Sequence, residues 1–242
     1  MTDRSVEPSP KLYARIGGVL YLIIIVAGGL AEFSRGNLIV SADAAATANK
    51  IMASESLFRI GVAAELGMLV CAVALALILY VLLGPVSKNL ALLATLFNMV
   101  SIAIEGATRV SLFAALFPLG GAGYLKAFDP QQLQALAYLP LKFYDYGFAT
   151  SLVFFGCGLF LYGYLIFRSD FFPKFLGAFL ILGAVLYLFN SFAVFVAPEF
   201  ENIIFPAIVL PAGLAELSFC LWLIIVGVNV PNWERKANRV AS

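Results

Sequence analysis

Residues 57–84 read LFRIGVAAELGMLVCAVALALILYVLLG, and this apolar segment indicates the fold class. The hydrocarbon core of a bilayer is about 30 Å thick, and a helix needs about 20 apolar residues to cross it. A strand of a membrane barrel would alternate between apolar and polar residues, which this stretch does not do. Because backbone groups in lipid have to be hydrogen-bonded within their own segment, we expect a transmembrane helix here.

The composition of the whole chain agrees with this segment. Hydrophobic residues make up 62% of the sequence and charged residues 12%, against about a quarter charged in soluble domains. We therefore predict an all-α, polytopic membrane protein, with a six-helix transmembrane domain over residues 12–230 between tails at 1–11 and 231–242. The expected spans are 12–33, 57–84, 90–117, 143–167, 175–197 and 203–228.

Two connections are longer than the others and carry helix signals of their own. The Ala-rich connection 34–56 predicts a short surface helix. Asp129-Pro130 supplies an N-cap and a first-turn proline, and the following residues 131–139 place apolar side chains on one face. That pattern predicts a short interfacial helix on the outer side. For the first span a cleaved signal peptide stays open as an alternative, because small residues near Gly29–Ala31 resemble a cleavage site.

The distribution of Lys and Arg predicts the orientation of the bundle. With both termini in the cytoplasm, nine basic residues lie on the inner side and five on the outer side. An excess of Lys and Arg in cytoplasmic loops is the usual pattern. We therefore expect a protein of the bacterial inner (cytoplasmic) membrane with both termini cytoplasmic.

Several kinds of chemistry are excluded by what the sequence lacks. The chain has no histidine, which rules out histidine-dependent zinc sites, His-ligated haem and Ser-His or Cys-His catalysis. Its three cysteines, Cys71, Cys157 and Cys220, all lie in expected spans, too few for a four-cysteine metal site and unsuited to a disulfide framework. The net charge of +1 gives no reason to expect a nucleic-acid partner. We predict no cofactor and no metal.

Six ionisable side chains fall inside the expected spans or at their edges. Charged residues at membrane depth usually face a bundle interior, a partner group or a water-filled cavity. A rise of about 1.5 Å per residue places all six in the outer half of the bilayer or near its midplane. They are Glu32, Glu65, Glu105, Arg109, Asp145 and Glu216.

Spacing and depth predict how the central members of this set meet. Glu105 and Arg109 are four residues apart, so their side chains share one face of a helix. Glu65 lies at the same expected depth as Arg109, and the forked guanidinium of an arginine can serve two carboxylates.

Glu216 is predicted to be the carboxylate that is free to change protonation. Its expected polar neighbours at the same depth are Glu105, Asn190 and Asn98. Asp145 and Glu32 are expected at the mouth of the cavity that these residues form. The pattern therefore predicts one outward-facing polar cavity, and the lipid bilayer as the surroundings of the bundle.

Three classes of function stay open on this evidence. The first is binding or transport of a small cationic or apolar solute, or of protons, through the cavity. The second is a non-catalytic scaffold or accessory subunit, acting as a homo-oligomer or with a membrane partner, whose charges only pair helices. The third, an intramembrane hydrolase, needs two carboxylates at one water-accessible point. The sequence has no motif for it, so we do not expect an enzyme.

The chain also resembles a known family over most of its length, from about Leu12 to Trp233. The clearest matching segments are FYDYG at 143–147, FFG at 154–156, GYLIFRS at 163–169 and PKFLG at 173–177. These segments are similar to the bacterial membrane proteins grouped as domain of unknown function 4386. The resemblance implies a polytopic helical membrane protein without an established activity, and it assigns no functional residue.

Overall fold

The computed structural model describes residues 9–197 and 201–241, and over these residues the secondary structure is helical, with no strand. This confirms the all-α fold class. The elements are α1 (Pro10–Leu38), α2 (Ala44–Ala53), α3 (Glu55–Leu83), α4 (Lys88–Ala114), the 3-10 helix η1 (Gly123–Ala127), α5 (Pro130–Arg168), α6 (Lys174–Val196), α7 (Glu201–Ile225) and α8 (Val230–Ala241).

The helices begin where side chains can satisfy their first backbone N–H groups. The side chain of Ser9 accepts a hydrogen bond from the N–H of Leu12, with Pro10 in the first turn of α1. Asp129 and Gln132 form a capping box at the start of α5, and Pro130 occupies its first turn. Such caps stabilise a helix start by about 0.5–2 kcal/mol, and a proline costs nothing where no N–H is needed.

Five helices of the described residues are long and apolar enough to cross a membrane, namely α1, α3, α4, α5 and α6. A sixth candidate is α7, whose described part joins α8 across a bend of 99°. With 25 residues, α7 is about 37 Å long at 1.5 Å per residue, which exceeds the thickness of the hydrocarbon core. The helices therefore form a polytopic membrane bundle.

One local prediction is wrong. Residues 131–139 do not form a separate interfacial helix, because α5 runs without a break through Pro140 to Arg168. The first turns of α5 pack against α2, where the Tyr138 hydroxyl accepts a hydrogen bond of 3.0 Å from the N–H of Ala42. The short helix on this side of the bundle is α2, within the connection 34–56. The C-terminal segment that follows the last span forms the helix α8.

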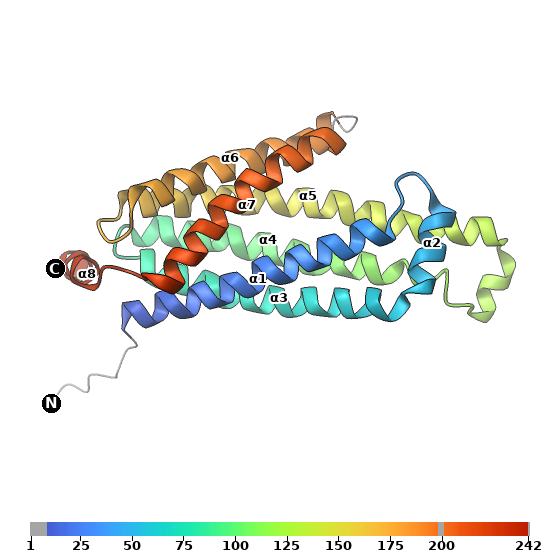
Figure 1. Ribbon diagram of the computed structural model, residues 1–242, viewed down its shortest axis with the longest axis horizontal. Coiled ribbons are helices and arrows are strands. Elements are labelled where there is room, and N and C mark those ends of the chain that lie inside the picture. The colour runs from blue at the N-terminus through green and yellow to red at the C-terminus, as the bar shows by residue number, and fades with distance from the viewer. Residues whose placement is uncertain (1–8, 198–200, 242) are drawn as a thin grey trace.

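Figure 1 shows α1, α3, α4 and α5 running lengthwise beside one another, with α2 lying across one end of the bundle. We call this end the α2 end and the opposite one, where α8 lies, the α8 end. The helix α1 begins and α7 ends at the α8 end. Helices α6 and α7 form a hairpin that lies against α5 and α1, and α7 diverges from α1 toward the α2 end.

Buried apolar side chains form two cores, one toward each end of the bundle. The larger one, the α8-end core, includes Leu82, Leu165, Leu180 and Leu223 and joins α1, α3, α4, α5, α6 and α7. The α2-end core joins α1, α2, α3, α4 and α5. Its members are Leu38, Ile51, Phe58, Val62, Leu112, Ala115, Leu116, Leu141 and Tyr144. The space between the two cores holds the charged side chains.

The helix α8 caps the ends of other helices at the α8 end. Gly227, with a φ of +75°, lets the chain turn sharply after α7. The indole N–H of Trp233 then donates to the carbonyl of Leu82 (2.9 Å), and the Lys236 ammonium donates to the carbonyl of Arg168 (2.9 Å). The last carbonyls of a helix have no partner within it, so these side chains satisfy groups at the ends of α3 and α5.

Candidate functional site

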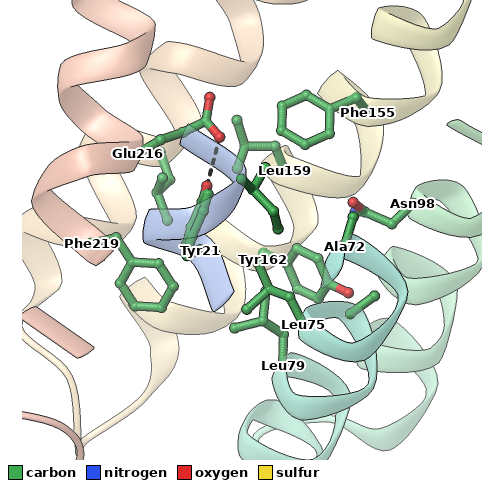
Figure 2. A pocket seen from close by; sticks show the side chains of 13 residues that line it. Tyr21, Ala72, Leu75, Leu79, Asn98, Phe155, Leu159, Tyr162, Glu216 and Phe219 are labelled. Atoms are coloured by element: carbon green, nitrogen blue, oxygen red, sulfur yellow. Dashed lines mark hydrogen bonds between the residues drawn. The ribbon is translucent and has the colours of Figure 1, made fainter. Parts of the chain in front are cut away.

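A cavity of about 530 Å³ lies between the two cores. Six helices contribute to its wall, from α1, which supplies Gly28, Gly29 and Glu32, to α7, which supplies Gly213 and Glu216. A smaller cavity of about 80 Å³ continues toward the α8-end core and shares Glu216 with the larger one. Figure 2 shows this smaller cavity, with Glu216 at one side and the rings of Phe155, Tyr162 and Phe219 around it.

One part of the large cavity carries a network of ion pairs centred on Glu65 of α3. Its carboxylate is contacted by Arg35 of α1 and by Arg109 of α4, with 2.7 Å between Arg109 Nε and Glu65 Oε2. Arg109 also pairs with Glu105 one helical turn earlier (3.1 Å), and Arg35 pairs with Glu32 (2.7 Å). We call these five residues the arginine network.

Tyr144 of α5 supports the arginine network from one side. The guanidinium carbons of Arg35 and Arg109 lie 4.8 and 5.0 Å from the centre of its ring. A cation at this distance is attracted to the electron-rich face of an aromatic ring, more strongly where water is excluded. The two cations and the ring thus connect α5 to α1, α3 and α4 at this depth.

The second polar group of the cavity is built around Glu216 and contains no arginine. The hydroxyl of Tyr21 on α1 donates to one carboxylate oxygen of Glu216, and the hydroxyl of Tyr187 on α6 donates to the other, both at 2.7 Å. Figure 2 shows Tyr21 and Glu216 pointing toward each other. We call these three residues the tyrosine-glutamate cluster.

Glu216 is only 8% exposed, and no basic side chain of the described residues pairs with it. A buried carboxylate is costly unless it is paired, protonated or hydrogen-bonded. Here it receives two neutral donors. Each tyrosine is oriented by an edge-on aromatic contact, Tyr21 with Phe219 and Tyr187 with Phe155, at ring distances of 6.5 and 5.6 Å.

The structure brings five of the six predicted site residues to one cavity. Glu32, Glu65, Glu105, Arg109 and Glu216 line it. Asp145, which was expected at the mouth, is not among the residues that line it. It pairs with Lys142 (3.1 Å) on the same helix, with part of its side chain exposed. Asp145 directly follows Tyr144, whose ring turns inward, so Asp145 lies on a different face of α5.

Three residues of the site were not predicted from the sequence. Arg35 was placed in a connection, but α1 continues to Leu38 and carries Arg35 back toward the bundle. The spacing of Glu32 and Arg35, three residues apart, is a signal that could have found it. Tyr21 and Tyr187 were missed because tyrosines in membrane proteins most often belong to interfacial belts. They occupy the hydrogen-bonding positions on Glu216 that were expected for Glu105, Asn190 or Asn98.

Within residues 9–197 and 201–241, no group of three or more Cys, Asp or Glu side chains is arranged to hold a metal ion. The cysteines Cys71, Cys157 and Cys220 are free. The thiol of Cys220 lies 3.4 Å from the carbonyl of Gly18, a contact between α7 and α1 near the tyrosine-glutamate cluster. The chemistry that the described site offers is therefore that of carboxylates, guanidinium groups and tyrosine hydroxyls.

Comparisons with known proteins identify a family and name no activity. A family model described as "Domain of unknown function (DUF4386)" matches residues 16–227. An uncharacterized protein of Archaeoglobus fulgidus is 30% identical over 155 residues, which are 64% of this chain and 76% of that protein. No solved structure matches the chain. The match to the family model covers most of the sequence, and the chain therefore belongs to the DUF4386 family of proteins of unknown function.

Proposed function

We propose that the protein binds a small organic cation with apolar substituents in the cavity, with Glu216 as the anionic group that contacts it. Protons compete with this ligand for the same carboxylate. The observation that carries the proposal is the environment of Glu216, a buried carboxylate with two hydroxyl donors and no basic partner among the described residues. A bound cation would supply the missing countercharge.

The charge balance of the cavity wall supports a cationic ligand. Four carboxylates and two guanidinium groups line it, which leaves an excess of two negative charges when all are ionised. The two arginines balance two of the three carboxylates Glu32, Glu65 and Glu105. One of the two excess charges therefore stays within the arginine network, and the other lies on Glu216, which has no basic partner among the described residues. In surroundings of low polarity such a charge attracts a cation more strongly than it would in water.

The remaining wall of the cavity suits the apolar substituents of such a ligand. Phe148, Leu152, Phe155 and Met68 line it together with Tyr187. Aromatic faces attract cations, and alkyl groups gain free energy from burial against Leu and Met. The volume of about 530 Å³ lies within the range of about 300–1,000 Å³ that is usual for small-molecule pockets.

Binding of octyltrimethylammonium to the protein in lipid nanodiscs tests the proposal. We expect Glu216→Gln to weaken binding at least about tenfold, because the amide has nearly the same shape and can accept a hydrogen bond from one tyrosine and donate to the other, but has no charge. Asp145→Asn is the matched control, since it makes the same chemical change outside the cavity. Calorimetry against empty nanodiscs separates binding from partitioning into lipid. Equal affinity of wild type and Glu216→Gln would refute the role of Glu216.

Movement of protons is tested separately in proteoliposomes that contain a pH-sensitive dye. If the protein exchanges the cation for protons, an imposed gradient of octyltrimethylammonium drives a pH change that Glu216→Gln abolishes. Glu65→Gln serves as a second variant, because Glu65 is held by two arginines and is not the exchanging group in this scheme. A pH change that survives in Glu216→Gln would contradict exchange at this carboxylate.

A scaffold or accessory subunit is the second candidate, and the arginine network favours it. The network connects α1, α3 and α4 through buried ion pairs, which is what charges that only hold helices together would do. This alternative predicts that Glu105→Gln lowers stability sharply, and that a stoichiometric partner is recovered from native membranes. A hydrolase has less support, because Glu216 is the one cavity carboxylate among the described residues that is not paired with an arginine.

We also propose that the α8 end faces the cytoplasm, in the cytoplasmic membrane of the cell. The supporting observation is the excess of Lys and Arg near that end, which is eight against five among the described residues. Single cysteines introduced at Lys236 of α8 and at Lys126 of η1 test this by their reaction with a membrane-impermeant maleimide in intact cells. We expect reaction at residue 126 only, and the reverse result would invert the orientation.

A further inference from the structure

The contact between α1 and α7 changes character along its length. Near the α8 end the two helices touch: a Cβ atom built on Gly18 would lie 2.7 Å from Ile224 Cγ1 and 2.8 Å from the Ile224 backbone nitrogen. Further along, the hydrogen bond between Tyr21 and Glu216 still joins them. Beyond that point Gly29 and Gly213 line the cavity, and a Cβ on either would meet nothing within 4 Å. Figure 1 shows the same divergence.

At each end of the cavity along the bundle axis, one of the two cores packs between α1, α3, α4 and α5. The α8-end core lies on the α8 side of Glu216. The α2-end core lies on the α2 side of the arginine network. Its members Phe58 and Val62 lie one to two helical turns from Glu65 toward the α2 end, and Leu112 lies about one turn from Arg109 in the same direction. Since α2 also packs across α5, α1 and α3, this end is covered by backbone and apolar side chains. Among the described residues, the wall between α1 and α7 at Gly29 and Gly213 is a part of the cavity that neither core covers.

The rim of this part of the cavity has the character of a lipid-facing surface. Phe33 of α1 lines the cavity and is 72% exposed, and Leu210 and Leu214 of α7 are exposed as well. Gly29 lies nine residues before the end of α1, about 14 Å along the helix axis, which is within the hydrocarbon layer. Glu32, with 54% of its side chain exposed, is the polar residue at this rim.

We infer that the cavity is entered sideways from the membrane, through the gap between α1 and α7, and that its ligand is a membrane-partitioning cation with an alkyl or aryl tail. This deepens the proposed function and rests on it for the charge of the ligand. The cationic head would lie at Glu216, and the tail would extend past Gly29 and Gly213 toward the acyl chains. A ligand that reaches the site through lipid is concentrated there by its own partitioning.

Spin labels test the route without any ligand. In a variant whose three native cysteines are replaced by alanine, a label on Gly213→Cys reports collisions with oxygen, which dissolves in lipid, and with a water-soluble nickel chelate. We expect the collision rates at residue 213 to match those of a label on Val110→Cys, which is an exposed position on the membrane-spanning α4. A label on Tyr124→Cys, exposed on η1, provides the aqueous reference. Collision with nickel as frequent as at residue 124 would overturn sideways entry.

The ligand class is tested by comparing two cations in nanodiscs, tetramethylammonium and octyltrimethylammonium. We expect the octyl compound to bind at least about a hundredfold more tightly, because each added CH2 group that leaves water contributes to burial in lipid and in the cavity. Equal affinities would overturn the proposed tail. If neither compound binds, the proposed function fails, while the spin-label result still decides whether the gap opens to lipid.

Discussion

Glu65 and Glu216 line the same cavity and are stabilised in opposite ways. Two arginines contact Glu65, while two tyrosine hydroxyls donate to Glu216. The ion pairs of Glu65 balance the charge of this carboxylate and hold helices in register, so Glu65 offers no net charge to a ligand. Hydroxyl donors orient a carboxylate without neutralising it. The difference separates a part of the cavity that holds the bundle together from a part that is available for binding.

The largest effect is expected from breaking the arginine network. Arg109→Met would leave Glu65 and Glu105 buried with one of their cations removed, and we expect a loss of about 3–5 kcal/mol in the free energy of unfolding. Unfolding by denaturant in mixed micelles measures it. Glu216→Gln, which removes no ion pair, is expected to change the same free energy by less than about 1 kcal/mol. Similar losses for both variants would remove the contrast between the two groups.

The second-largest effect concerns the contact between α1 and α7, which is close at Gly18 and open at Gly29. Gly18→Ala places a methyl group against the backbone of Ile224, and we expect it to cost about 1–3 kcal/mol through overpacking. Gly29→Ala meets open space and should be neutral or stabilising by up to about 1 kcal/mol, because alanine favours the helix. Thermal unfolding of the two variants side by side tests this. Equal costs would show that the helices do not diverge.

A smaller effect concerns the hydroxyl donors. Tyr187→Phe and Tyr21→Phe each remove one donor from Glu216, and we expect each to cost about 1–2 kcal/mol, since hydrogen bonds to charged groups exceed neutral ones. A double-mutant cycle with Glu216→Gln measures how much the charge of Glu216 strengthens each hydrogen bond. Additive effects of Tyr187→Phe and Glu216→Gln would mean that the charge adds nothing to this hydrogen bond.

The smallest effect is expected at the pair outside the cavity. Lys142 and Asp145 lie three residues apart on α5 with partly exposed side chains, so Lys142→Met should change stability by less than about 1 kcal/mol. Lys142→Met and Arg109→Met make the same kind of change, because each replaces a cation with an apolar side chain. A loss at Lys142 as large as that at Arg109 would show that burial is not what distinguishes the two pairs.

The bundle and part of the site were predictable from the sequence because they depend on local properties. Apolar length predicts spans, and the spacing of Glu105 and Arg109 predicts their ion pair. Helix ends are weaker signals. The first span was predicted to end at residue 33, but the helix continues to Leu38. Arg35 therefore lies on α1, within the arginine network, and not in a connection. Residues 131–139 and the span from residue 143 were expected as two helices, yet α5 continues from one to the other through Pro140.

Hydropathy and residue spacing were enough to predict a helical membrane bundle with charged residues at membrane depth, because both act over a few turns of one helix. The partners of those charges follow from the way the helices pack. Tyr21 and Tyr187 are 195 and 29 residues away from Glu216 in the chain, and both meet it through the way α1, α6 and α7 cross. Crossing and divergence of helices depend on packing against several neighbours at once, and no single segment encodes that packing.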